Sequence, residues 1–190
     1  MIKELNTLLK TAFADSDIFN NVFGLAESVM DDNGEFPAIY NGGGNYSMIN
    51  LDSEQSFIYW RVINDIPVDK ANERESLTSC SSKDELIFKV PLIFVCFAKK
   101  QSISDCIGFE EYQFAEEIVK ILNTVKPRTI SNVQEGSVLI KKIITSHPKL
   151  INNEYKGREI TGFNYEYAYI GIEASIEMLV NTTCLGCQTS

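Results

Sequence analysis

Apolar positions that recur every three or four residues predict two amphipathic helices. The first occupies residues 2–13, and its apolar stripe is made by Ile2, Leu5, Leu8, Leu9 and Phe13. The second occupies residues 109–125, with charged residues on one face and, on the other, Phe114, Ile118, Ile121, Leu122 and Val125. Asp15 and Ser16 are typical N-cap residues, so we expect a further short helical segment to run from them through Leu25.

Runs rich in aromatic and β-branched residues predict the strands. They occupy residues 36–40, 46–50, 56–63, 86–98, 137–145 and 165–180. The stretch Asp31-Asp32-Asn33-Gly34 signals a turn before the first of them. Pro91 cannot donate to a strand ladder, so it predicts a bulge, a bend or an edge in the longest run. The last run is expected to be one strand, or two joined at Gly171, with Ile170 to Met178 facing the interior.

Polar stretches separate these elements. Residues 64–85 predict a loop or an insertion, a second loop is expected to include Pro148, Asn152 and Gly157, and residues 182–190 predict a short flexible tail. The chain of 190 residues is of a size typical for one domain, so we expect residues 1–190 to form one. The predicted fold class is α+β. It has a mixed, largely antiparallel sheet packed by the N-terminal helix and the long amphipathic helix at about 109–125.

The charges are distributed unevenly along the chain. The net charge of −9 argues against a general nucleic-acid binder, because phosphate backbones require a basic surface. Residues 1–55 carry nine acids and two bases, a net of −7, whereas residues 126–160 carry seven bases and three acids, a net of +4. The two regions are either ordinary solvated surfaces or complementary contact surfaces. The charged residues that we expect at such an interface are Asp31, Asp32, Lys141 and Lys142.

The N-terminal stretch, the apolar runs and the cysteines indicate where in the cell the protein is expected. Glu4, Asn6 and Lys10 interrupt the first apolar stretch, so it does not resemble a signal peptide, and no apolar run is long enough to span a membrane. Five cysteines, with Cys96 inside an apolar run, fit reduced thiols better than a secreted disulfide framework. We therefore expect a protein of the cytoplasm, unless it is exported as part of a larger particle, and no contact with a membrane.

Three consecutive glycines, Gly42, Gly43 and Gly44, stand between the first two predicted strands. A Walker-type phosphate loop needs a lysine after its glycines, and a dinucleotide-binding loop needs a helix there. Asn45 and Tyr46 follow instead and begin a predicted strand. The glycines therefore predict a hairpin turn, with backbone docking of a partner as the alternative.

The C-terminal CxxC, Cys184 to Cys187, could be half of a zinc site or a redox pair. A structural zinc needs a second pair of ligands, and Cys80, Cys106 and the single His147 show no ligand spacing. We expect two incidental thiols in a tail and a histidine on the surface. No cofactor and no metal site are predicted.

Glu154-Tyr155-Lys156 has the E-x-K form of many nuclease sites, where acids hold a magnesium ion and the lysine steadies the reacting charge. Such sites also need an earlier metal-binding aspartate. Asp84 and Asp105 are possible, but neither stands at a clear strand end. A small magnesium-dependent nuclease that uses Glu154 and Lys156 is thus one hypothesis of function, and a solvated loop is the alternative.

The order of elements resembles that of the tail terminator, or tail-completion, proteins of long-tailed bacteriophages. The resemblance lies in LIFKVPLIFVCFAKK, EEYQFAEEIVKILNTV, VLIKKIIT and NYEYAYIGIEASIEML, a long strand, one strong helix and two closing strands. It implies a structural virion protein that is not an enzyme. Copies would form a ring, commonly a hexamer, that joins the tail tube to the head connector after assembly in the cytoplasm of a bacterial host. A head-closure or injection-system adaptor is the nearest alternative.

Overall fold

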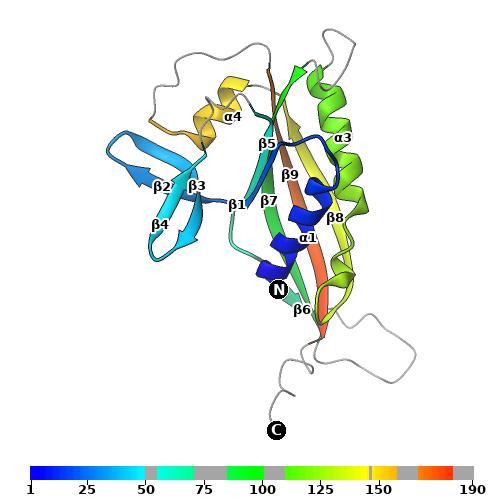
Figure 1. The fold of residues 1–190 in the computed structure, drawn as a ribbon. Helices are drawn as coiled ribbons and strands as arrows, with labels where there is room; N and C mark the ends of the chain where they lie inside the picture. The colour runs from blue at the N-terminus through cyan, green and yellow to red at the C-terminus, as the bar shows by residue number, and fades with distance from the viewer. Residues whose placement is uncertain (50–54, 71–84, 101–109, 146, 158–166, 182–190) are drawn as a thin grey trace, which may run out of the picture.

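The computed structural model describes residues 1–49, 55–70, 85–100, 110–145, 147–157 and 167–181. They form an α+β fold with a mixed, mostly antiparallel sheet, as the sequence predicts, and helices lie on both faces of this sheet (Figure 1). The strand order in this main sheet is β1-β5-β7-β9-β8. The strands are β1 (Asn21–Leu25), β5 (Phe57–Val62), β7 (Glu85–Lys99), β9 (Tyr167–Asn181) and β8 (Val133–Ile144), and β6 (Val68–Lys70) also pairs with β7.

The centre of the sheet is the antiparallel pair β7 and β9. Its register runs without a shift from Glu85 opposite Asn181 to Lys99 opposite Tyr167, so β9 is a single continuous strand. Even-numbered side chains of β9 lie in the core under the helices, whereas Tyr167 and Tyr169 lie in a second core on the other face. Both faces of this strand are therefore buried at its start, which explains why its apolar pattern changes phase there.

Pro91 does not produce the predicted bulge against β9, because it lies in register opposite Ser175. Its carbonyl accepts the N–H of Ile63 at 3.1 Å, one residue beyond the end of β5. The N–H and C=O of one strand residue point to the same side, so the missing donor of Pro91 falls at the gap between β5 and β6. The proline is tolerated at this local edge.

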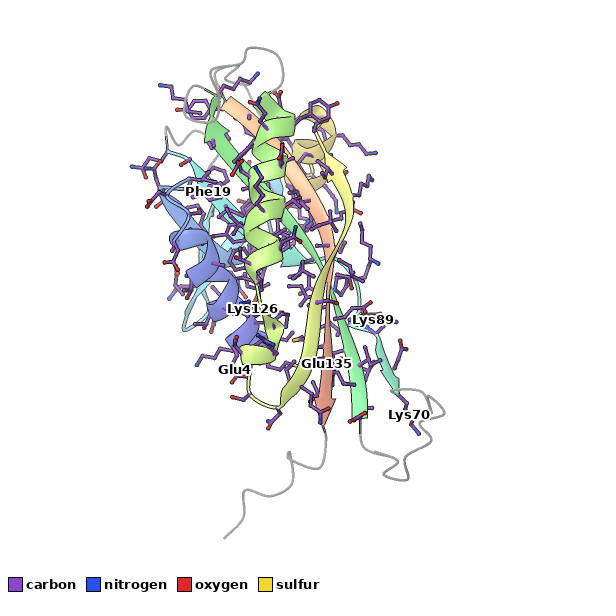
Figure 2. All side chains as sticks on the ribbon, turned by 90° about the vertical axis from the view of Figure 1, so that its right-hand side faces the viewer. Glu4, Phe19, Lys70, Lys89, Lys126 and Glu135 are labelled. Carbon is purple, nitrogen blue, oxygen red and sulfur yellow. The ribbon has the colours of Figure 1, made fainter. Side chains whose placement is uncertain are left out.

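Two helices form the layer on one face of the sheet. These are α1 (Ile2–Ala14) and α3 (Glu110–Thr124), close to the predicted bounds. They lie next to each other (Figure 2) and pack against the even-numbered side chains of β7 and β9, in a core whose fully buried members include Leu9, Phe13, Trp60, Phe94, Phe114 and Ile118. A 3-10 turn, η1 (Pro127–Thr129), follows α3 and leads into β8.

The opposite face is covered in part by α4 (His147–Glu154) and by a three-stranded sheet, β2 (Glu27–Asp31), β3 (Gly34–Gly42) and β4 (Asn45–Met48). Their apolar side chains meet a row of rings on the main sheet. Phe97 stacks on Tyr167 with ring centroids 4.5 Å apart and on Phe57 at 4.8 Å. Both turns predicted in this segment, at Asp31 to Gly34 and at the glycines, are confirmed as the hairpins that join the three strands.

The helical segment predicted through Leu25 is wrong. Ser16 donates its hydroxyl to the carbonyl of Phe13 at 2.6 Å and closes α1 instead of capping a new helix. Asp17 then adopts φ of 57°, which ends helical geometry. The chain continues as β1, which pairs in parallel with β5, so tertiary pairing overrides the local cap signal.

Two predicted loops contain regular structure. Residues 147–154 form α4 because Leu150 and Ile151 become buried against the main sheet, and Pro148 lies in the first turn, where its missing N–H is not needed. Within the predicted loop or insertion at 64–85, β6 pairs with β7. Residues 71–84 and the predicted tail at 182–190 lie outside the described residues.

The buried face of α3 should supply much of the stability of the helix layer. Replacing Leu122, which is fully buried, by alanine should lower the free energy of unfolding by about 3 kcal/mol through lost contacts and a cavity. Tyr112 on the same helix is 65% exposed, and Tyr112→Ala should cost less than about 1 kcal/mol. Urea unfolding of both variants measures the difference; equal costs would contradict the packing described.

Candidate assembly surfaces

Residues 27–48, which form β2, β3 and β4, are called the arm here. Figure 1 shows the arm projecting from the side of the main sheet opposite α3. It is fixed at two places, because the N–H of Ala26, just before β2, donates to the carbonyl of Trp60 and the N–H of Glu35, beside the β2–β3 turn, donates to the carbonyl of Lys156, both at 2.8 Å. Buried side chains hold the base, whereas most of the remaining arm is exposed. The arm is therefore a supported projection whose own surface is available for contact.

The arm carries an unusual share of exposed apolar side chains. Among the residues that the structure describes, half of the exposed large apolar side chains are on the arm, namely Met30, Tyr40, Tyr46 and Met48. The rings of Tyr40 and Tyr46 lie 5.2 Å apart, and the hydroxyl of Tyr46 donates to Glu27 at 2.9 Å, which raises the pKa of that phenol. Clustered exposed apolar groups mark interaction sites more often than scattered ones do.

The three glycines form the turn between β3 and β4. Gly42, Gly43 and Gly44 have φ values of 91°, 60° and 80°, all in the left-handed region that favours glycine. A Cβ atom on Gly42 or Gly44 would meet nothing within 4 Å, and on Gly43 only Asn45 at 3.7 Å. The hairpin prediction is confirmed, and the open surroundings leave the backbone accessible to a partner, which stays a prediction.

Asp31 and Asp32 lie at the other end of the arm, at the turn between β2 and β3. One carboxylate oxygen of Asp31 accepts the N–H of Asn33 at 2.8 Å and steadies this turn. The neighbouring Met30 is 76% exposed. The predicted acidic residues and the predicted glycines therefore belong to one small sheet but to opposite ends of it.

The lysines predicted at an interface lie on β8, which is an edge strand of the main sheet. Lys141 and Lys142 are exposed, and Leu139 and Ile143, which lie on opposite faces of the strand, are both more than a third exposed. A register shift between Ile140 and Lys142 leaves Lys141 without an opposing residue on β9. Bulges and lysines on an edge strand discourage indiscriminate pairing, but the edge remains open to a partner of complementary charge.

The structure separates the two residues of the nuclease hypothesis. Arg61 holds both oxygens of Glu154, through Nε at 2.8 Å and Nη2 at 2.6 Å, and the hydroxyl of Tyr59 donates to the same carboxylate at 3.0 Å. Lys156 instead pairs with Glu35 at 3.1 Å. The Glu154 carboxylate is buried and fully engaged, so it acts in this structure as the partner of a guanidinium and not as an open metal ligand.

The Arg61–Glu154 pair is the polar feature that sequence reasoning missed. The two residues are 93 positions apart. No motif or spacing in the sequence links strand 56–63 to the segment after residue 145. Burial and the nearby charge of Glu154 raise the pKa of Tyr59 well above its usual value, so the phenol remains a donor. The pair and the phenol together fix the end of α4 to β5.

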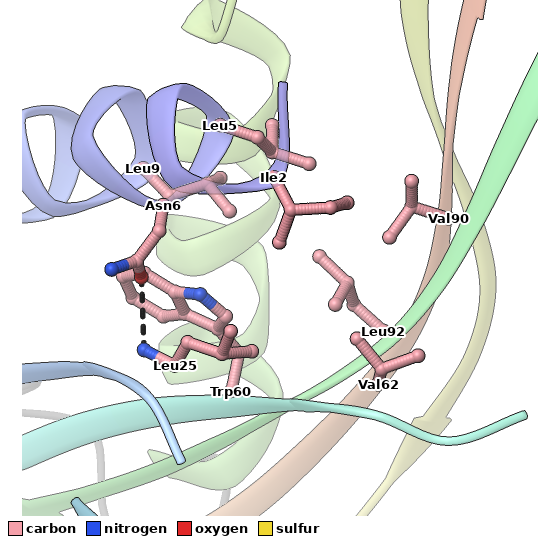
Figure 3. Close-up of a pocket in the computed structure, with 9 residues that line it drawn as sticks. All are labelled: Ile2, Leu5, Asn6, Leu9, Leu25, Trp60, Val62, Val90 and Leu92. Carbon is pink, nitrogen blue, oxygen red and sulfur yellow. Dashed lines mark hydrogen bonds between the residues drawn. The ribbon is translucent and has the colours of Figure 1, made fainter. Parts of the chain in front are cut away.

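The space between α1 and the main sheet is too small for a ligand. Figure 3 shows this narrow, mainly apolar cavity, in which the side-chain oxygen of Asn6 accepts the N–H of Leu25 at 2.9 Å. Its volume is about 10 Å³, at most the room of a single water molecule. A shallower groove of about 280 Å³ lies at the base of the arm, between the start of β2 and the end of β5.

The cysteines and the histidine give no assembled site among the described residues. Cys96 is free and fully buried, and burial raises the pKa of its thiol well above the usual value, which suits an unreactive core position. Cys184 and Cys187 lie outside the described residues. His147 begins α4, but its side chain also lies outside the described part.

Breaking the buried ion pair should destabilise the protein. Glu154→Ala leaves the guanidinium of Arg61 without its carboxylate in a largely buried setting, so the free energy of unfolding should fall by about 3 kcal/mol. Lys156→Ala removes a lysine that is 61% exposed and should cost about 0.5 kcal/mol or less. Thermal and urea unfolding of both variants measure these costs. A Glu154→Ala variant as stable as Lys156→Ala would refute a structural role for the pair.

The described residues contain no metal cluster and no helix that could span a membrane. Within the ranges that the structure describes, no three His, Cys, Asp or Glu residues gather where a metal ion could bind. None of the described helices has the length and apolar character needed to cross a membrane. In comparisons with known proteins, no family model matches the chain and no curated protein matches it.

Proposed function

We propose that this chain is a structural assembly protein, a tail terminator or neck connector of a tailed bacteriophage or a related injection machine. In this role its copies form a ring, and the ring joins a tail tube to a head connector. The observation that carries the proposal is the presence of two unlike exposed surfaces on one fold. One is the arm, with its apolar and acidic side chains, and the other is the lysine-bearing edge strand β8.

Closed rings need such a pair of surfaces. In a ring, a patch on each copy contacts a different patch on the next, whereas a two-fold dimer uses the same patch twice. Figure 1 supports this geometry, because the arm projects to the left of the main sheet and β8 lies on its right. A copy that offers both surfaces can bind a neighbour on each side, which is the minimum requirement for ring formation.

The remaining features fit a scaffold. The long β7–β9 ladder and the helix layer give a stiff body, and the space between α1 and the main sheet is a crevice of only about 10 Å³. The carboxylate of Glu154 and the thiol of Cys96 are committed to the interior. These observations support a protein that works through its surfaces.

The proposal predicts a defined oligomer. The purified 21.4 kDa chain should elute as a particle of several copies, about six, in size-exclusion chromatography with light scattering. Negative-stain images of the same fraction should contain rings with a central opening. A chain that remains monomeric up to roughly millimolar concentration, where even weak contacts would form, would contradict the proposal.

The glycine turn provides a second test, because it separates folding from assembly. Gly43→Trp should leave the monomer folded at a cost of about 1–2 kcal/mol for a side chain in the left-handed region. The bulky ring should nevertheless weaken assembly, if a partner backbone approaches this turn. Gly43→Asn is the matched control, because asparagine tolerates the same φ and adds little bulk. Circular dichroism reports folding and light scattering reports assembly; equal assembly of both variants would exclude this turn from the contact.

A further inference from the structure

We propose that β4 of one copy pairs with β8 of the next copy, along the edge of β8 that faces away from β9. The sheet of the arm and the main sheet of the neighbour then become one continuous sheet. This inference rests on the proposed ring and names the contact that builds it. It is carried by two open strand edges and by the side chains that accompany their free backbone groups.

Both strands lie at the edge of a sheet. Among the described strands, β4 pairs with β3 alone and β8 pairs with β9 alone. All four residues of β4 are exposed, and so are most of residues 134–143 on β8. In addition, β4 contains neither proline nor a charged residue, which are common means of keeping an edge strand from pairing. The edge of β4 is therefore well suited to accept another strand.

The free backbone groups of β4 belong to its two apolar residues. Just beyond the strand, the N–H of Ile49 donates to the carbonyl of Pro37 at 3.0 Å. Backbone groups alternate in direction along an antiparallel strand, so Ser47 also points toward β3. Tyr46 and Met48 then point their N–H and C=O groups out of the arm. Their side chains are 42% and 45% exposed.

The same alternation identifies the free groups of β8. The N–H of Ile63 donates to the carbonyl of Pro91, so odd-numbered residues of β7 point toward β5 and, across the unshifted ladder, odd-numbered residues of β9 point toward β8. Residues of β8 opposite even-numbered residues of β9 therefore point outward. They include Val138, Ile140 and Ile143, whose side chains all lie on the face that carries α3.

This arrangement selects antiparallel pairing. Two residues that exchange hydrogen bonds in an antiparallel ladder place their side chains on the same face. Antiparallel pairing of the two edges therefore sets Tyr46 and Met48 beside the outward-pointing apolar residues of β8. Parallel pairing would instead set them on the opposite face of β8, which carries Ser137, Leu139 and Lys142.

The spacing of the apolar residues selects a register. One residue separates Tyr46 from Met48, and one residue separates Val138 from Ile140, whereas the register shift after Ile140 interrupts the spacing to Ile143. The contact therefore sets Tyr46 opposite Ile140 and Met48 opposite Val138. The glycine turn of the arm then lies next to the bulge of β8, and its lack of side chains lets the two backbones approach.

Charge favours pairing of unlike edges. The arm contains four carboxylates and no lysine or arginine, whereas β8 contains two lysines and one acid. Pairing of β4 with β4 would bring two acidic arms together, and pairing of β8 with β8 would bring their lysines together. The β4-to-β8 contact avoids both repulsions. Because the arm and β8 lie on opposite sides of the fold, each copy can make this contact with two neighbours (Figure 1).

Proline substitution tests the backbone pairing apart from the side chains. Met48→Pro and Val138→Pro each remove an N–H that points out of its own sheet, and the matched controls Met48→Ala and Val138→Ala keep that N–H. Each proline variant should raise the concentration of half-assembly, measured by light scattering, by about tenfold or more over its alanine control. Thermal unfolding within a few degrees of the control confirms that the fold is intact.

Mixing the two proline variants tests whether the contact joins unlike edges. The Met48→Pro variant keeps an intact β8, and the Val138→Pro variant keeps an intact β4. At a concentration where each variant alone is monomeric, an equimolar mixture should form a one-to-one pair and no larger species in native mass spectrometry. If either folded variant alone forms dimers, like edges pair and the proposed contact is wrong.

Hydrogen exchange of the unmodified chain provides a test that needs no variant. Above the assembly concentration, amide exchange should slow by about tenfold or more in peptides that cover residues 45–48 and 136–143. It should change less in β2, at the other edge of the arm. Slower exchange in only one of the two strands, or in neither, would overturn the contact.

The outcomes separate this contact from the ring itself. If the unmodified chain forms rings and the proline variants assemble as well as their alanine controls, the β4-to-β8 contact is wrong and the proposed function stands. If a proline variant fails to fold, the exchange experiment on the unmodified chain decides. If the unmodified chain forms no oligomer at all, both proposals fall.

Discussion

The continuous antiparallel ladder between β7 and β9 is the interaction on which the rest of the structure depends. Fifteen paired positions without a register shift fix which side chain of each strand faces which layer. A slip by one residue would turn Ile172 and Ile176 away from α3 and bring Glu173 and Glu177 into the core. The helix layer, the second core and the edge strand β8 all take their positions from this register.

The second face is stabilised by a different kind of contact. There α4 and the base of the arm pack on rings, and the buried Arg61–Glu154 pair sets where α4 ends. Lys156 follows that end and accepts, through its carbonyl, the N–H of Glu35 at the start of β3. One ion pair between the main sheet and α4 therefore positions the arm indirectly, and the arm can project without being a loose loop. Such positional specificity, rather than net stability, is the better-supported role for a buried ion pair.

Sequence reasoning succeeded where the signal was local. The apolar stripes of α1 and α3 and the glycine hairpin depend on residues close together in the chain, and these elements were predicted correctly. It failed for β1 and α4, since Ser16 offers a plausible cap and Pro148 resembles a loop residue until the packing of distant strands is known. Exposure of Met30 was also beyond the sequence, because an apolar residue in a strand normally predicts burial.

The charge distribution explains why a surface with exposed apolar groups need not associate indiscriminately. With a net charge of −9, two copies repel over most orientations, and the repulsion is greatest where the acidic arms approach each other. The exposed lysines of β8 instead attract an approaching arm. Apolar contact then adds affinity only in the orientation that the charges select. In the proposed ring, electrostatics therefore chooses the neighbour, and burial of exposed apolar side chains such as Met30 holds the contact once it has formed.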